Sequence, residues 1–297
     1  MTKFSVIIPV YNRAHLISET LETVLKQVYS NFEIIIVDDG SKDELGKLIG
    51  DKYSPDQRVR YFYKQNEERG AARNYGLTKA TGDFAVFFDS DDFMKPTYLE
   101  DLYKVISHNQ DVRMLALKYN YDNNGTIEYH PLLKKLPEGW YDHQLFLKGN
   151  ILACNFCIKL KNHSYKPFPS ERELASMEDW LFLLANLIDQ KIYIKEAIGV
   201  TMRQHDERSM SHNQKVIEAR RNATDWTLKN ISLSDTDKKR LIAWSHYFCG
   251  IHQYLDHKRG VSVKEAINAI KGEGFNKLFL TLLAKSIIGR RLIQKLK

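Results

Sequence analysis

Short apolar runs alternate with stretches of helical periodicity over the first hundred residues. The apolar runs, which predict buried strands, are 4–8, 32–37, 60–63 and 84–88. The intervening segments, which predict helices, are 14–27, 44–52, 67–80 and 97–108. Alternation of this kind implies right-handed βαβ units, and so an α/β fold with a mainly parallel sheet flanked by helices. We expect the first strand to stop at Pro9, because proline cannot donate to a ladder.

Polar residues follow three of these strands directly, at 9–12, 38–41 and 89–92. The carboxyl ends of parallel strands share one edge of the sheet, and ligands bind beyond that edge. A binding site there explains three polar clusters better than three unrelated turns do. No G-x-G-x-x-G or G-x-x-x-x-G-K-[ST] pattern follows the first strand, so dinucleotide and P-loop sites lose their main support.

Three acids, Asp89, Asp91 and Asp92, stand within four residues at the end of the fourth strand. Carboxylates this close repel one another unless a positive group lies among them. Hard oxygen ligands favour Mg²⁺ or Mn²⁺. The structural alternative is a polar turn that caps the helix beginning near Pro96.

The pattern is less regular after residue 110. Strands are predicted at 113–121, 126–129, 153–160 and 191–200, the first two joined by a hairpin turn at 123–125. A helix is predicted from Trp180 to Asp189, with Ser176 as its N-cap. From 213 onward the pattern is helical. We therefore divide the chain into an α/β domain, 1–212, with halves 1–110 and 111–212, and a helical C-terminal extension, 213–297.

Charge is concentrated near the end of the chain. Residues 271–297 hold seven lysines and arginines against one acid, which accounts for most of the net charge of +7. The remaining body is close to neutral, which argues against a nucleic-acid-binding core. Within 274–297, basic residues interleave with apolar ones at helical spacing, as in helices that lie on anionic membrane surfaces. Docking onto the 1–212 domain is the alternative.

The expected compartment is the cytoplasm, with the inner face of the cell membrane as the setting if 274–297 bind lipid. Three cysteines do not suggest a disulfide framework, and no signal peptide or spanning stretch is evident. Cys154 and Cys157 have CxxC spacing, but buried core cysteines explain the pair as well as a metal or redox role does.

Five motifs, taken in order, resemble those of the family 2 glycosyltransferases, which have the GT-A fold. They are Pro-Val-Tyr-Asn at 9–12, Val-Asp-Asp-Gly-Ser at 37–41, Arg-Gly-Ala-Ala-Arg-Asn at 69–74, Asp-Ser-Asp-Asp at 89–92 and Glu-Asp-Trp at 178–180. The resemblance is dense over 3–100, sparser to about 212, and fades beyond. No subfamily signature appears at 113–175, so the acceptor is not indicated.

The resemblance assigns the acidic cluster to a metal and a nucleotide sugar. It implies that Asp91 binds Mn²⁺ or Mg²⁺ and that Asp89 lies near the ribose and the metal. Asp92 binds the metal directly or supports a residue that does. A metal held between carboxylates and phosphate oxygens stabilises the departing diphosphate. His205, in the segment that closes over the diphosphate with Ser209 and Ser211, is a further metal ligand, with a plain surface histidine as the alternative.

The nucleotide-binding residues follow from the same resemblance. Asp39 accepts a hydrogen bond from the base, which suits the N3–H of uracil, or else makes an Asx-turn before Gly40. Tyr11 packs on the base, or is an ordinary core tyrosine, and Pro9 shapes the loop.

Arg69 and Arg73, four apart on one helix face, are expected to meet the diphosphate. The alternative is a solvated face paired with Glu67 and Glu68.

Asp179 is the expected general base, which takes the proton of the acceptor hydroxyl in an inverting transfer. Its neighbours Glu178 and Trp180, together with Arg203, are expected to contact the acceptor or to support residues that do. The alternative is that the two acids merely occupy the first turn of a helix, where acids are common.

The sequence thus predicts an inverting, metal-dependent glycosyltransferase that uses a nucleotide sugar, with a UDP-sugar favoured. The acceptor is expected to be a glycan or lipid-linked glycan in bacterial surface polysaccharide synthesis. Two alternatives stay open: a nucleotide-sugar-binding protein without catalysis, and a nucleotidyltransferase.

Overall fold

The computed structural model describes residues 1–123, 125–205 and 212–295, and the chain divides into two compact units. The first unit contains Met1–Asp142, Ile151–Arg172 and Asp189–His205. The second contains His143–Asn150, Glu173–Ile188 and Asp206–Lys297. The second unit therefore takes in two earlier segments besides the helical extension.

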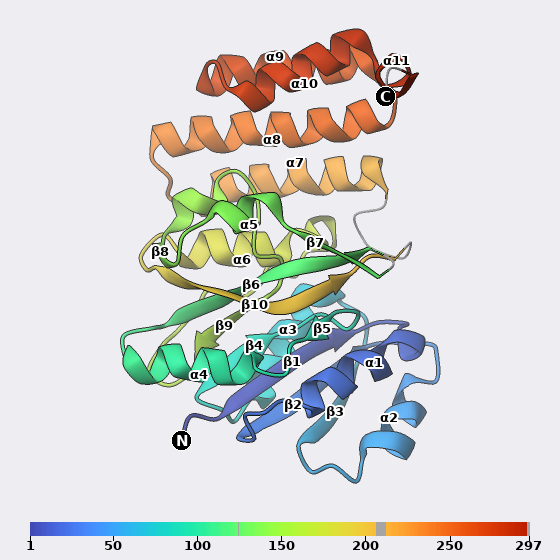
Figure 1. Ribbon diagram of the computed structural model, residues 1–297, viewed down its shortest axis with the longest axis vertical. Coiled ribbons are helices and arrows are strands. Elements are labelled where there is room, and N and C mark those ends of the chain that lie inside the picture. The colour runs from blue at the N-terminus through green and yellow to red at the C-terminus, as the bar shows by residue number, and fades with distance from the viewer. Residues whose placement is uncertain (124, 206–211, 296–297) are drawn as a thin grey trace. The chain divides into compact units, whose positions relative to one another are not determined.

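The first unit is built on one mixed sheet of strand order β3-β2-β1-β4-β9-β6-β10-β5, with β7 beside β6 and β8 beside β10 (Figure 1). Its strands are β1 (Phe4–Val10), β2 (Phe32–Asp39), β3 (Val59–Lys64), β4 (Phe84–Phe87), β5 (Phe93–Met94), β6 (Met114–Asn123), β7 (Thr126–Tyr129), β8 (Gly139–Tyr141), β9 (Phe156–Lys159) and β10 (Ile192–Arg203). β3, β2, β1 and β4 are parallel, and β9 runs antiparallel to both β4 and β6. The α/β architecture predicted from the sequence is confirmed.

The helices of this unit are α1 (Ala14–Leu25), α2 (Leu45–Tyr53), α3 (Glu68–Lys79), α4 (Tyr98–His108) and the short α5 (Pro131–Lys135). α3 lies close against the sheet because Gly76 has no side chain: a Cβ there would approach Ile7 Cγ2 to 2.5 Å. This close packing fixes the helix that carries Arg69 and Arg73.

The expected end of β1 at Pro9 is wrong, since the strand continues to Val10. Pairing of β1 with β4 ends at Ile7, and the Ile7 carbonyl accepts from the Phe88 N–H at 3.1 Å. Residues two apart on a strand face the same neighbour. Pro9 therefore faces the side on which the ladder has ended, where no donor is required.

Two local features were not as predicted. β5 has only two residues and was not expected. Its antiparallel pairing with β10 fixes the end of the acidic loop. The N-cap of α6 (Glu178–Asn186) is Met177 and not Ser176, whose φ of 77° is left-handed. The hairpin between β6 and β7 is present, with Asn124 outside the described residues.

The second unit is helical: α6, α7 (Asn213–Asn230), α8 (Asp235–Leu255), α9 (Arg259–Glu273), α10 (Lys277–Ile288) and α11 (Arg290–Lys295). α7 packs on α8, α8 on α9, and α9 on α10 (Figure 1). Ala243, Trp244, Ala269 and Phe279 form a shared core of α8, α9 and α10. Every helix among the described residues is too short or too polar to cross a bilayer.

Candidate active site

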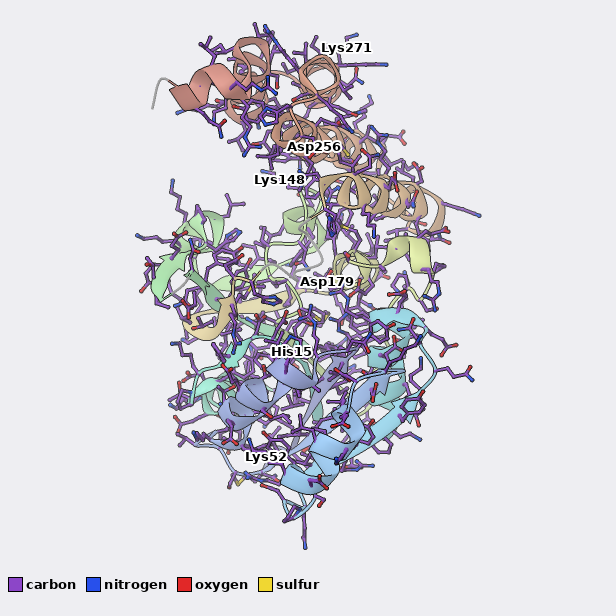
Figure 2. The ribbon with its side chains drawn as sticks, turned by 90° about the vertical axis from the view of Figure 1, so that its right-hand side faces the viewer. His15, Lys52, Lys148, Asp179, Asp256 and Lys271 are labelled. Atoms are coloured by element: carbon purple, nitrogen blue, oxygen red, sulfur yellow. The ribbon has the colours of Figure 1, made fainter. Side chains whose placement is uncertain are left out.

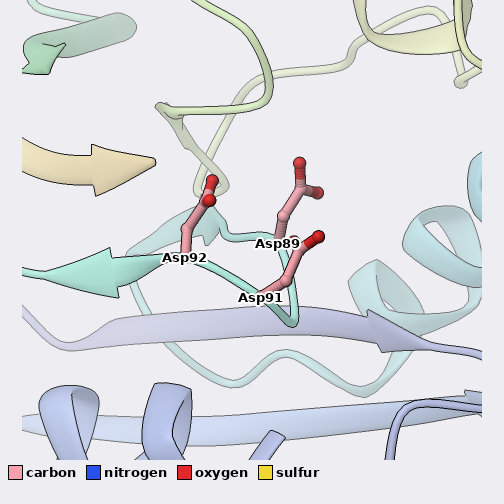
Figure 3. A group of neighbouring side chains, drawn as sticks. All are labelled: Asp89, Asp91 and Asp92. Carbon is pink, nitrogen blue, oxygen red and sulfur yellow. The ribbon is translucent and has the colours of Figure 1, made fainter. Parts of the chain in front are cut away.

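The acidic loop between β4 and β5 is held at both ends. Phe88 N–H bonds the Ile7 carbonyl, Thr20 Oγ1 donates to the Ser90 carbonyl at 3.0 Å, and β5 pairs with β10. The carboxylates of Asp89, Asp91 and Asp92 project from this loop toward one side (Figure 3). One oxygen of each lies within 4.8 Å of the others. Three acids are therefore held in one small volume by a rigid backbone.

Asp91 contacts an arginine and a histidine through the same oxygen. Its Oδ2 accepts a hydrogen bond from Arg13 Nη1, and His205 Nε2 lies 2.8 Å away from the same atom. Burial by itself would raise the pKa of Asp91, but Arg13 and then His205 hold that pKa below its ordinary value. The carboxyl group is thus ionised at neutral pH. His205 is partly buried beside Asp91, so the surface-histidine alternative is wrong.

Asp89 is paired with the most deeply buried arginine of the first unit. Arg73 Nη2 donates to Asp89 Oδ1 at 2.8 Å, and its guanidinium lies 5.6 Å from the Phe168 ring. Arg73 is only 1 % exposed, so the solvated-face alternative is wrong for it. Arg69, four residues earlier on α3, is half-buried.

The two acids that the alternative interpretation paired with these arginines form ion pairs with other residues. Glu67 bonds Lys64 at 2.7 Å and Glu68 bonds Arg172 at 2.9 Å.

Asp92 ties β10 to the cluster. It is buried, and its Oδ1 accepts from the backbone N–H of Arg203 at 3.2 Å. The Arg203 guanidinium lies 4.3 Å from the Phe93 ring and bonds Glu19 at 2.5 Å. These acids do not cap the next helix, since Thr97 is the N-cap of α4 and has no side-chain cap bond. The capping-turn alternative is therefore wrong.

The donor set fits a hard divalent cation. Three carboxylates and one imidazole converge, which matches the ligand preferences of Mn²⁺ and Mg²⁺. The hydrogen bond from the Arg13 guanidinium to Asp91 shows that this carboxylate is placed to hold a positive charge.

The Asx-turn that was the alternative role for Asp39 is made by its neighbour Asp38. The Asp38 carboxylate accepts a hydrogen bond from Ser41 N–H at 2.7 Å. Asp39 is 2 % exposed. Its Oδ1 accepts from Lys64 Nζ and Glu67 N–H, while its Oδ2 accepts from the Asn66 side chain alone among the described residues. An acceptor position therefore remains on Oδ2.

The loop after β1 is shaped by Asn12. Its φ is 51°, its N–H donates to Ser41 Oγ at 2.9 Å, and its Oδ1 accepts from Lys42 N–H at 2.8 Å. Tyr11 is 44 % exposed, so the core-tyrosine alternative is wrong and its ring is accessible. Pro9 is buried in β1.

In the second unit, Asp179 lies at the start of α6 (Figure 2). Asn150 Nδ2 donates to its Oδ2 at 2.9 Å, and the Trp180 N–H donates to its Oδ1 at 2.7 Å. These two hydrogen bonds fix the orientation of the half-buried Asp179 carboxylate.

Trp180 and Glu178 are buried beside it. The Trp180 Nε1–H bonds the Phe146 carbonyl at 2.7 Å, and the guanidinium of Arg220 covers the ring at 3.8 Å. Trp180 is 1 % exposed and Glu178 is 3 % exposed. Of the two roles expected of them, support of neighbouring residues fits this burial and direct contact with an acceptor does not.

Three residues were missed by sequence reasoning: Arg13, Asn150 and Arg220. Arg13 directly follows the polar cluster at 9–12, so its position after a strand end could have identified it as a site residue. Asn150 and Arg220 lie in segments without any motif. Ser209 and Ser211 lie outside the described residues.

The fold and the acidic strand-end site define a GT-A enzyme domain. The chain resembles residues 1–349 of TarS from S. aureus, solved in complex with UDP-GlcNAc, with a TM-score of 0.67 and 22% identity over 96% of this chain and 87% of that one. It also resembles the mannosyltransferase PcManGT from Pyrobaculum calidifontis, solved with GDP-Man and Mn²⁺, with a TM-score of 0.62 and 15% identity over 99% and 83% of the two chains. The predicted GT-A fold is confirmed.

The family follows from the sequence match. Residues 5–163 match the family model described as Glycosyl transferase family 2, so this chain belongs to that family, as predicted. The glycosyltransferase GlyA of Streptococcus pneumoniae serotype 4 is 34% identical over 142 residues, which is 48% of this chain and 20% of GlyA. EpsH of Bacillus subtilis is 32% identical over 186 residues, 60% of this chain and 54% of EpsH. The chain spans at most about half the length of these two relatives.

Proposed function

We propose that this chain transfers a sugar from a nucleotide sugar to a hydroxyl group of a glycan or lipid-linked glycan, with inversion at the anomeric carbon. The observation that carries the proposal is the convergence of Asp89, Asp91 and His205 at the carboxyl end of the parallel strands. That edge of an α/β sheet is where ligands bind. TarS and PcManGT, which share the fold, were solved with nucleotide sugars.

The proposed metal is Mn²⁺ or Mg²⁺, held by Asp91 and His205 with Asp89 beside them. When bound, the ion would act as a Lewis acid that neutralises charge on the departing diphosphate. Arg73 fixes the Asp89 carboxylate, and Asp92 fixes the end of β10. Arg69, one turn earlier on α3, is proposed to face the diphosphate.

The proposed donor is a UDP-sugar. The remaining acceptor position on Asp39 Oδ2 matches the single donor on the pairing edge of uracil, its N3–H. The exposed ring of Tyr11 offers a face on which a base can stack.

The proposed base is Asp179, which takes the proton of the acceptor hydroxyl as that oxygen attacks the anomeric carbon. Its position at the first turn of α6 places it near the positive end of the helix dipole, which favours the carboxylate. The proposed setting is surface polysaccharide synthesis at the inner face of a bacterial membrane, with residues 274–297 as a peripheral membrane contact.

The test is to incubate the protein with a panel of nucleotide sugars and Mn²⁺ and to measure nucleoside diphosphate release. UDP release from one sugar, reduced at least about 100-fold in Asp179→Asn with unchanged UDP affinity, supports both the reaction and the base. Release of pyrophosphate would identify a nucleotidyltransferase instead. Full activity of Asp179→Asn would remove the base assignment.

A further inference from the structure

A cavity of about 430 Å³ opens in the second unit, between the end of α8, the start of α9 and the junction of α10 with α11. Four of its lining residues are cationic or can become so: His257, Arg259, Arg290 and Arg291. No carboxylate is among its described lining residues.

The backbone builds this cavity. His257 has a φ of 59° and turns the chain between α8 and α9, and Gly289 has a φ of 92° and separates α10 from α11. Arg290 Nη1 donates to the Leu255 carbonyl, which fastens α11 to the end of α8. The Arg259 side chain passes 4.0 Å from the position that a Gly289 Cβ would occupy. The arginines are thus brought together by two left-handed turns and one capping bond.

The three arginines that line the cavity carry more charge than the neighbouring carboxylate of Asp256, which accepts a hydrogen bond from the Asn213 side chain of α7 at 2.5 Å. Like charges held together raise the electrostatic energy of the fold unless an anion joins them. Guanidinium groups bind phosphate oxygens with two parallel hydrogen bonds, so a phosphate is the anion that this cavity suits.

The same cavity has an apolar rim. Ile288 and Leu292 line it and are 46% and 52% exposed. Further apolar side chains are exposed along 275–287: Phe275, Leu278, Leu280 and Ile287. A ligand with a phosphate and hydrocarbon chains matches both parts of this surface.

We propose that the cavity binds the phosphate of an anionic phospholipid headgroup, with the apolar side chains of α10 and α11 entering the lipid. This inference rests on the peripheral membrane contact proposed above, and it adds a defined phosphate site. Arg259 and Arg291 hold the phosphate, while Arg290 keeps its bond to α8.

The test is flotation of the full chain with vesicles of phosphatidylcholine alone or with 30 % phosphatidylglycerol, a composition of about the anionic content that attracts basic segments. The double variant R259Q/R291Q should bind the anionic vesicles about 30-fold more weakly, because two basic side chains leave the surface. The control K239Q/K271Q removes the same charge from exposed lysines at the opposite end of the α8–α9 pair (Lys271, Figure 2), where Gly272 packs against Ala243. It should bind as the wild type does.

Each outcome is decisive. Equal weakening of both double variants means that binding follows net charge, which overturns the site. Unchanged binding of R259Q/R291Q overturns the site and leaves the membrane contact standing. Failure of the wild type to float overturns the contact itself. If the wild type does not float but binds soluble glycerol phosphate at millimolar concentration, the cavity is a site for a free phosphate ester and not for lipid.

Discussion

We predict that Arg13 competes with the proposed metal ion for Asp91, so that its removal should tighten metal binding. Its guanidinium bonds the oxygen of Asp91 that His205 also contacts. A metal that binds this oxygen must first displace Arg13. The perturbation is Arg13→Met, which removes the charge and all donors while keeping the length of the side chain.

The expected size follows from the environment of the pair. The two side chains are 20% and 15% exposed, so the ion pair is mostly shielded from water. At an effective dielectric constant of 20 and a separation of about 3 Å, the Coulomb attraction is about 5 kcal/mol. Hydration of the two separated charges offsets most of this attraction. The net contribution of the pair is then roughly 2 kcal/mol, which is typical of a hydrogen bond to a charged group. Removing the competitor should therefore tighten Mn²⁺ binding about 30-fold.

The assay is a titration of nucleotide-free protein with Mn²⁺, followed by the electron paramagnetic resonance signal of free Mn²⁺. Arg13→Lys, which keeps the charge, is the matched control and should bind Mn²⁺ with nearly wild-type affinity. Asp91→Asn should abolish binding in either background. If Arg13→Met binds Mn²⁺ no more tightly than the wild type, the competition argument is wrong.

Three further predictions concern stability, each measured by urea unfolding. Glu33 has its pKa lowered to about 2 because hydrogen bonds from Ser5, Thr81 and Arg60 outweigh desolvation; Glu33→Gln should cost about 2 kcal/mol at pH 7 after allowance for solvent screening. A lowered acid pKa stabilises the fold above the ordinary value of 4.5, so the difference should shrink as the pH falls from 4.5 toward 2, and a constant difference would contradict it. Gly76→Ala should cost about 1–3 kcal/mol through its clash with Ile7, whereas Gly50→Ala, with nothing within 4 Å, should cost nothing. Burial lowers the pKa of Arg220 to about 9, because the charged guanidinium is costly to bury. Arg220→Met should therefore stabilise the fold at pH 7 by about 2 kcal/mol, which is the burial cost minus the lost interaction with the Trp180 ring. A destabilised variant would refute this.

The strand-end clusters were predictable because they depend on local pattern. An apolar run of five residues followed by acids needs no tertiary information to be identified as a buried strand entering a site. The contact of His205 with Asp91 joins residues 114 apart in sequence. It was expected only from resemblance, because the pairing of β10 with β6 and β5 that brings His205 there leaves no periodic signal.

The missed features are tertiary. β5 is too short for an alternating pattern to register, and it exists because β10 supplies its partner. The continuation of β1 through Pro9 depends on where β4 stops pairing, which the sequence of β1 does not contain. Asn150 reaches Asp179 from a loop without regular structure, so no spacing rule identifies it.

We predict that Asp91 is the acid that would exchange its cation for the proposed metal, and the contacts of the three acids support this. Arg73, beside Asp89, is 1 % exposed and lies over the Phe168 ring, so it cannot leave without disrupting the core. Asp92 accepts a hydrogen bond from the backbone N–H of Arg203 in β10, which the sheet holds in place. Arg13 is different, because it is the N-cap residue of α1 and its side chain is 20% exposed. The cation beside Asp91 is therefore more accessible to solvent than the one beside Asp89, which is why we expect the proposed metal to displace Arg13 and not Arg73.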